Sequence, residues 1–182
     1  MADPADRDII ELSGQKGQEE AAFNLIVKTY SERLYWHIRK IVLDHNDADD
    51  VLQNVYLKVW INLQTFRNDS SLYTWLYRIA TNESLSHLRK KKNQSLLSDE
   101  KYLEMAGEQL KADPFFNGTE IQLKFQEAIL RLPEKQRLVF NMKYFDNMKY
   151  EEISEILETS TGALKASYHH AVRKIKIYLE ME

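Results

Sequence analysis

Cysteine is absent from the chain of 182 residues. Without cysteine there is no disulfide framework, no thiolate ligand for zinc and no cysteine nucleophile. Glycine and proline are scarce, with five and three residues, so the chain lacks most of the turn-forming residues that an all-β protein needs. This scarcity predicts an all-α fold.

Long apolar runs and an apolar leader are also missing. No stretch approaches the roughly 20 residues of a membrane span, and the start, MADPADRDIIEL, lacks a basic segment followed by an apolar one. We therefore expect a cytoplasmic protein. With 43% hydrophobic and 29% charged residues, the composition is that of a globular protein rather than a disordered chain.

The motifs of common enzyme classes are missing as well. The chain contains no GxSxG nucleophile motif, no GxxxxGK(S/T) phosphate loop and no HExxH metal motif. His169 and His170 are adjacent, about 100° apart on a helix, which is poor geometry for two ligands of one metal. We predict no enzymatic activity, no cofactor, no small-molecule substrate and no metal site.

The net charge of −3 conceals a segregation of charge along the chain. Residues 65–92 contain six basic and two acidic residues, and residues 159–176 contain four basic and no acidic residues, so each stretch carries +4. Residues 93–120 contain two basic and six acidic residues, which gives −4. Because local patches rather than total charge indicate nucleic-acid binding, the sequence predicts two DNA-binding stretches.

Apolar residues recur at helical spacing in two blocks of the chain. The first block predicts three helices, over residues 19–43, 49–63 and 72–91, with residues 45–48 as a connection. The second block predicts four helices, over residues 120–132, 134–144, 150–157 and 160–179. Residues 93–119 lose the periodicity and predict an acidic linker, with at most a short helix near residues 101–110. We expect two small helical domains joined by this linker.

The last two predicted helices are separated by only Glu158 and Thr159, which is the spacing of a helix-turn-helix. Ser160 is the expected N-cap of the second of these helices. The face opposite its apolar stripe is small and polar at the start and basic further on, which suits base edges and then phosphates. A solvated basic helix of an ordinary bundle has the same pattern, so both interpretations stay open.

Aromatic residues such as Phe66 and Trp75 are interleaved along residues 65–92 with cations such as Arg67, Arg78 and Arg89. Single-stranded nucleic acid binds such combinations because bases stack on rings and phosphates pair with cations. Each aromatic residue taken singly also fits a core position.

These patterns also fit two other kinds of protein. A free-standing regulator that binds duplex DNA as a dimer explains residues 160–174. It leaves unexplained the acidic cluster around Asp49 and the stripe at helical spacing around Trp75, which consists of Ser71, Trp75, Arg78, Asn82 and Arg89. A helical adaptor that binds only proteins predicts no salt-dependent DNA affinity. The acidic cluster Asp47, Asp49 and Asp50 also fits simple compensation of a helix dipole.

Three motifs resemble the bacterial sigma factors of the extracytoplasmic-function class in order and spacing. They are DADDVLQNVYLKVW (47–60), FRNDSSLYTWLYRIATN (66–82) and LPEKQRLVFNMKYFDNMKYEEISEIL (132–157) followed by STGALKAS (160–167). The resemblance extends from about residue 19 to residue 179, apart from the linker. It implies four segments: an N-terminal segment (1–18), a region 2 domain (19–92), an acidic linker (93–119) and a region 4 helix-turn-helix domain (120–182).

The resemblance implies a promoter-specificity subunit. Such a subunit binds core RNA polymerase, recognises the −35 and −10 promoter elements and promotes DNA opening for transcription initiation. The implied partners are the β′ clamp helices and the β flap of core polymerase, promoter DNA in duplex and melted form, and an anti-sigma factor. The acidic linker is expected to thread through the active-site cleft of the polymerase toward the RNA exit channel.

The family's functional residues map onto three sets of positions. The implied contacts to core polymerase are Asp49, Asp50, Gln53 and Asn54. The implied contacts to the −10 element, with its flipped non-template base, are Phe66, Arg67, Ser70, Tyr73, Trp75, Arg78, Asn82 and Arg89. The implied contacts to the −35 element are Ser160, Thr161, Gly162, Ala163, Lys165, Ala166, Ser167, His170, Arg173 and Lys174.

Several positions depart from the family pattern. Asn54 stands where the core-binding motif usually has Glu, and Tyr56 stands where it usually has Phe. In the helix-turn-helix, Glu158 occupies the usual turn glycine, Ala163 a usual Thr and Ser167 a usual Arg. The last change removes an expected DNA cation, so these residues do not predict the promoter sequence.

Overall fold

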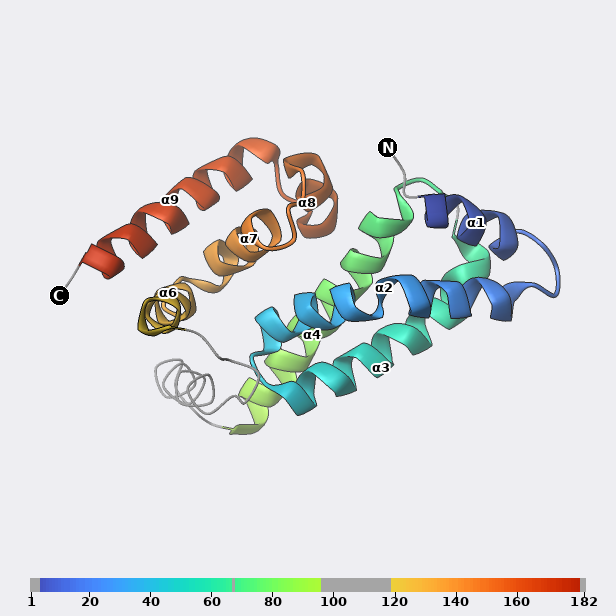
Figure 1. Ribbon diagram of the computed structural model, residues 1–182, viewed down its shortest axis with the longest axis horizontal. Coiled ribbons are helices and arrows are strands. Elements are labelled where there is room, and N and C mark those ends of the chain that lie inside the picture. The colour runs from blue at the N-terminus through green and yellow to red at the C-terminus, as the bar shows by residue number, and fades with distance from the viewer. Residues whose placement is uncertain (1–3, 67, 96–118, 181–182) are drawn as a thin grey trace. The chain divides into compact units, whose positions relative to one another are not determined.

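The computed structural model describes residues 4–66, 68–95 and 119–180. Within these ranges every regular element is a helix, which confirms the predicted all-α fold. The chain divides into two compact units, Met1–Arg89 and Lys90–Glu182, and each is described by itself (Figure 1). The short helix predicted near residues 101–110 lies outside the described residues.

The first unit is built around α2. Its elements are α1 (Pro4–Ser13), α2 (Glu19–Val42), α3 (His45–Asn62), the 3₁₀ helix η1 (Leu63–Thr65) and α4 (Leu72–Ser95) as far as Arg89. The apolar stripe of α2 is buried, with Ile26, Leu34 and Ile38 each 0% exposed. Helices α1 and α3 pack against α2, and α4 runs across the α2–α3 pair (Figure 1). The Nε2 atom of His37 in α2 lies 2.9 Å from Oγ1 of Thr81 in α4.

Helix α3 begins earlier than the sequence predicts. The expected connection over residues 45–48 is wrong, because the helix starts at His45. Its N-cap is Asp44, whose carboxylate accepts a hydrogen bond of 2.9 Å from the backbone N–H of Asp47. Apolar periodicity misses this turn because only Ala48 in it is buried.

Helix α1 is absent from the sequence prediction, which treats residues 1–18 only as an N-terminal segment. An isolated helix of 10 residues is marginal in water, so this one depends on its contacts with α2. Ile9 is 0% exposed, and the carboxylate of Asp6, which is 5% exposed, accepts a hydrogen bond from the Tyr30 hydroxyl. Tertiary contacts rather than a periodic stripe therefore stabilise α1.

The second unit contains the predicted helices with small changes at their ends. They are α6 (Glu120–Leu130), α7 (Glu134–Tyr144), α8 (Tyr150–Leu157) and α9 (Thr161–Glu180). The Ser160 hydroxyl accepts a hydrogen bond of 3.4 Å from the Ala163 N–H, which confirms Ser160 as the N-cap of α9. At the turn before it, Glu158 adopts a left-handed conformation with φ 49°. Glutamate therefore occupies the conformation for which a helix terminus usually employs glycine.

Helix α9 packs against α6, α7 and α8 and closes the core of this unit. Leu164 and Ala171 are both 0% exposed, and the Tyr168 ring stacks on Phe140 with centroids 5.7 Å apart. Arg137 of α7 is 7% exposed and donates a hydrogen bond of 3.3 Å to the Leu130 carbonyl at the end of α6. A cation at this helix C-terminus is favourable because the carbonyls there carry partial negative charge.

Candidate nucleic-acid and polymerase interface

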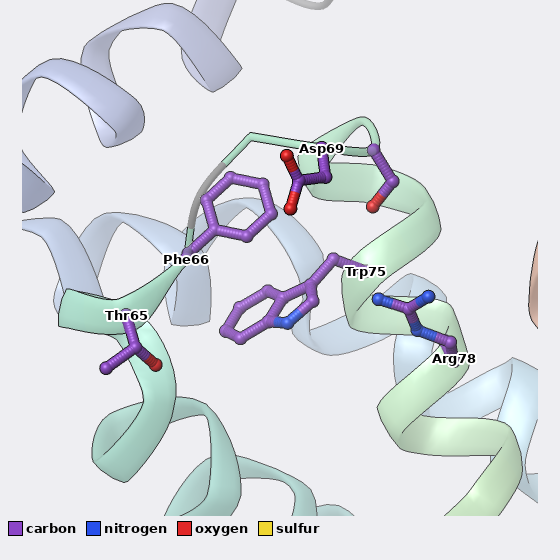
Figure 2. Close-up of a pocket in the computed structure, with 6 residues that line it drawn as sticks. Thr65, Phe66, Asp69, Trp75 and Arg78 are labelled. Atoms are coloured by element: carbon purple, nitrogen blue, oxygen red, sulfur yellow. The ribbon is translucent and has the colours of Figure 1, made fainter.

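An open hollow of about 160 Å³ lies where the loop after η1 meets the start of α4. Figure 2 shows the Phe66 ring and the Trp75 indole beside one another, with Asp69 from the loop and Arg78 from α4 at the edge. The two ring centroids are 4.9 Å apart. For comparison, a cavity of roughly 150 Å³ holds one benzene molecule. The hollow therefore has room for a single planar ring system.

The structure brings together only part of the predicted −10 set. Its members Phe66, Ser70, Trp75 and Arg78 line the hollow. Asn82 and Arg89 are exposed further along the same face of α4. The side chain of Tyr73 does not line the hollow, and its ring lies 4.3 Å from Tyr77. The predicted contact Arg67 lies outside the described residues.

Thr65 and Asp69 also line the hollow but are not among the predicted site residues. Both lie in the polar break between two amphipathic helices, so no apolar pattern marks them. Together with Ser70 they provide oxygen atoms, whereas the Arg78 guanidinium provides N–H donors. The hollow thus combines an aromatic wall with hydrogen-bond donors and acceptors.

The predicted contacts to core polymerase share one face of α3. Asp50, Gln53 and Asn54 are exposed, and Asp49 is partly exposed, with its Oδ2 atom 3.5 Å from Nε2 of His45. Sequence reasoning missed the continuation of this face by apolar residues. Leu57 is 61% exposed and Ile61 is 71% exposed, and the spacing of three and four residues places them in line with the polar group.

The predicted −35 set lies at the N-cap and along α9. The buried residues of α9 lie on its other face. Among the predicted contacts, Thr161 and Ser167 are partly buried. The others are exposed: Ser160, Gly162, Ala163, Lys165, Ala166, His170, Arg173 and Lys174. A Cβ atom added to Gly162 would meet nothing within 4 Å. Packing within the described protein therefore does not require glycine there.

A cluster around Tyr150 joins the predicted contact Lys165 to two cations that the sequence prediction left out, Lys143 and Lys149. The Nζ atoms of Lys143 and Lys165 lie 5.2 Å and 5.6 Å from the centroid of the Tyr150 ring. Lys149, next to Tyr150, is exposed. Burial, and then the neighbouring Tyr168, raise the pKa of Tyr150. The three lysines come from separate segments, so only the folded helix-turn-helix gathers them.

In the part of the chain that the structure describes, no group of three or more His, Cys, Asp or Glu residues could hold a metal ion. No described helix has the length and apolar character needed to cross a membrane.

Both units match known protein families. Residues 26–94 match Sigma-70 region 2, and residues 122–175 match Sigma-70 region 4. The ECF RNA polymerase sigma factor SigW of Bacillus subtilis (strain 168) is 30% identical over 171 residues, which cover 88% of this chain and 91% of that protein.

Solved structures share the fold at lower identity. CnrH in complex with the cytosolic domain of CnrY has a TM-score of 0.71 and 20% identity, and the match covers 98% of this chain and 99% of that one. The sigma factor RpoE in complex with the anti-sigma factor NepR from Bartonella quintana has a TM-score of 0.68 and 19% identity, with 88% of this chain and 98% of that one covered.

A region 2 bundle followed by a region 4 helix-turn-helix defines a sigma factor, the promoter-specificity subunit of bacterial RNA polymerase. The chain belongs to the extracytoplasmic-function (ECF) family of RNA polymerase sigma factors. The predicted family and function are thereby confirmed. A free-standing dimeric regulator and a protein-binding adaptor both leave the region 2 match unexplained.

Proposed function

We propose that the hollow beside Trp75 receives one unpaired base of the −10 element while promoter DNA opens. The observation that carries the proposal is the combination of a single-ring volume, about 160 Å³, with an aromatic wall made by Phe66 and Trp75. Extruding a base from a duplex costs a few kcal/mol, and stacking on an aromatic side chain returns about 1–3 kcal/mol per base. Asp69 and Arg78 would orient the base edge through hydrogen bonds.

The exposed face of α3 would bind the β′ clamp helices of core polymerase. Asp49 and Asp50 offer negative charge to a basic partner, and opposite charges across an interface speed and orient association. Leu57 and Ile61 offer apolar area that a partner would remove from water. A polar rim beside an apolar centre is the usual anatomy of such an interface.

Helix α9 would enter the major groove at the −35 element. Its first turns present the small residues Gly162, Ala163 and Ala166 to the base edges, and Arg173 and Lys174 would lie against phosphates. The lysines around Tyr150 would contact the backbone beside the groove.

In this proposal the region 2 domain comprises residues 19–92, the acidic linker residues 93–119 and the region 4 domain residues 120–182, after the N-terminal segment 1–18. The protein works in the cytoplasm and catalyses no reaction itself, since polymerisation belongs to the core enzyme. Its similarity to sigma factors solved in complexes such as RpoE with NepR supports an anti-sigma factor as a further partner.

The test compares promoter opening with duplex binding in reconstituted holoenzyme. A promoter library transcribed with core polymerase first identifies a promoter, and permanganate reactivity of its −10 thymines then measures opening. Trp75→Ala is expected to reduce opening roughly 5- to 150-fold, the equivalent of about 1–3 kcal/mol of stacking. Asn82→Ala should reduce opening in the same sense, and duplex gel shifts should change much less.

Trp36→Ala is the matched control, because Trp36 is 44% exposed on α2 and does not line the hollow. Trp75→Phe should restore part of the opening, since it keeps an aromatic face. Equal losses of opening and of duplex binding, or equal effects of the two tryptophan truncations, would contradict the proposed role of the hollow.

A further inference from the structure

Arg33 lies over the rings of two tyrosines that belong to different helices. Its guanidinium carbon is 5.5 Å from the ring centroid of Tyr30 in α2 and 5.3 Å from that of Tyr73 in α4. Both distances are within the roughly 6 Å at which a cation is attracted to an aromatic face. Arg33 therefore connects α2 to the first turn of α4.

The same cluster continues on either side of Arg33. The Tyr30 hydroxyl donates a hydrogen bond to Asp6 of α1, and the Tyr73 ring lies 4.3 Å from the Tyr77 ring. Burial lowers the pKa of Arg33, but the phenols of Tyr77, Tyr73 and Tyr30 together raise it by more. The guanidinium is charged in any case, since arginine keeps its proton in proteins.

The turn of α4 that carries Tyr73 also carries the wall of the hollow. The Trp75 N–H donates a hydrogen bond of 3.0 Å to the Ser71 carbonyl, and the Thr74 N–H donates one of 3.0 Å to the Ser71 hydroxyl. Tyr73 and Trp75 are two residues apart, so their side chains leave this turn in opposed directions. A contact that fixes Tyr73 on α2 consequently fixes the direction of Trp75 on the other side.

We propose that Arg33 is a positioning residue for promoter opening, because its contact with Tyr73 holds the first turn of α4 in the orientation that forms the hollow. This inference rests on the proposed function of the hollow. Arg33 is exposed, so its removal leaves the buried core of the unit intact. Lysine would keep the charge but lose the planar group that stacks on a ring.

The test starts with hydrogen exchange in the isolated protein. Arg33→Ala is expected to accelerate amide exchange in residues 71–77 about two- to tenfold, which is the range of one partly exposed cation–π contact. Arg33→Lys should give an intermediate value. Lys28→Ala, which removes another exposed cation of α2, should leave the exchange of this segment unchanged.

The second measurement is permanganate reactivity of the −10 thymines in holoenzyme. Arg33→Ala should lower it by a similar factor, while affinity for core polymerase, duplex binding and the melting temperature stay close to those of the wild type. Tyr73→Leu should also lower opening, and the double variant should lose less than the sum of the two single losses, because the two changes remove one shared contact.

The inference would be overturned if Arg33→Ala showed the same amide exchange in residues 71–77 and the same promoter opening as the wild type. It would also fall if losses of the two single variants were additive, or if core affinity and melting temperature fell in parallel with opening. If the wild-type holoenzyme itself opened no promoter, the proposed function of the hollow would fail instead, and the exchange data would still decide whether Arg33 orders α4.

Discussion

Tyr73 shows at the residue scale why membership of a motif does not establish a contact with DNA. It lies two positions before Trp75, and a step of 100° per residue separates their side chains by about 200° around the helix axis. Trp75 therefore lines the hollow, whereas Tyr73 lies against Arg33 and Tyr77. We infer that Tyr73 serves the −10 site through the orientation of α4.

Glu158 carries backbone strain that a substitution can remove. Its φ of 49° lies in the left-handed region, which costs a residue with a Cβ about 1–2 kcal/mol. Glu158→Gly should raise the free energy of unfolding by about 0.5–1 kcal/mol, because part of this gain is offset by the greater freedom of glycine in the unfolded chain. Urea unfolding of the two proteins provides the measurement.

The matched control is Glu155→Gly, since Glu155 is exposed in the interior of α8 with helical backbone. Glycine there should lower the free energy of unfolding by about 1 kcal/mol. Changes of the same sign in the two variants would contradict the assignment of strain to Glu158.

At the scale of whole elements, α2 and α3 are joined by a hydrogen bond between side chains. Tyr56 stands where the family usually has Phe, and its hydroxyl donates a hydrogen bond of 2.6 Å to the Ser31 hydroxyl. Burial raises the pKa of Tyr56, and the bond to Ser31 opposes this rise more weakly. The phenol is therefore kept protonated in the folded protein.

Tyr56→Phe should lower the free energy of unfolding at pH 7 by about 1 kcal/mol, the net value of one hydrogen bond. Folding raises the pKa of Tyr56. The protonated phenol therefore makes its full contribution to the free energy of unfolding below the pKa of the unfolded chain, about 10, and this contribution is lost as the pH rises through the pKa of the folded protein. The stability difference between wild type and variant should accordingly shrink in alkaline solution. Tyr144→Phe is the control, because Tyr144 is 54% exposed, and it should have little effect on stability at either pH. A stability difference between wild type and Tyr56→Phe that grows above pH 10 would contradict the assigned role of the Tyr56 phenol.

At the scale of the whole molecule, charges of opposite sign lie on different units. The basic face of α9 and the acidic face of α3 lie in separate compact units, although the net charge is only −3. Asp50→Lys should abolish binding to core polymerase, because a cation would then face the basic clamp helices and repel them.

The fold should survive this change, since Asp50 is exposed. Pull-down with core polymerase measures the binding, and circular dichroism checks the helices. Glu32→Lys, the same charge reversal at an exposed position of α2, should retain binding. Undiminished polymerase binding by Asp50→Lys would rule out the α3 face as the docking site.

The sequence by itself determined the helical class, the helices of the second unit and the family, since apolar spacing, caps such as Ser160 and the three motifs are local in the chain. The Asp44 cap that starts α3 at His45 is equally local, but apolar spacing does not record it. Tertiary structure alone decided two other features. Helix α1 forms because Ile9 and Asp6 pack on α2. Helical spacing within α4 separates Tyr73 from Trp75, but only the tertiary structure places Arg33 of α2 against Tyr73 and Phe66 against Trp75.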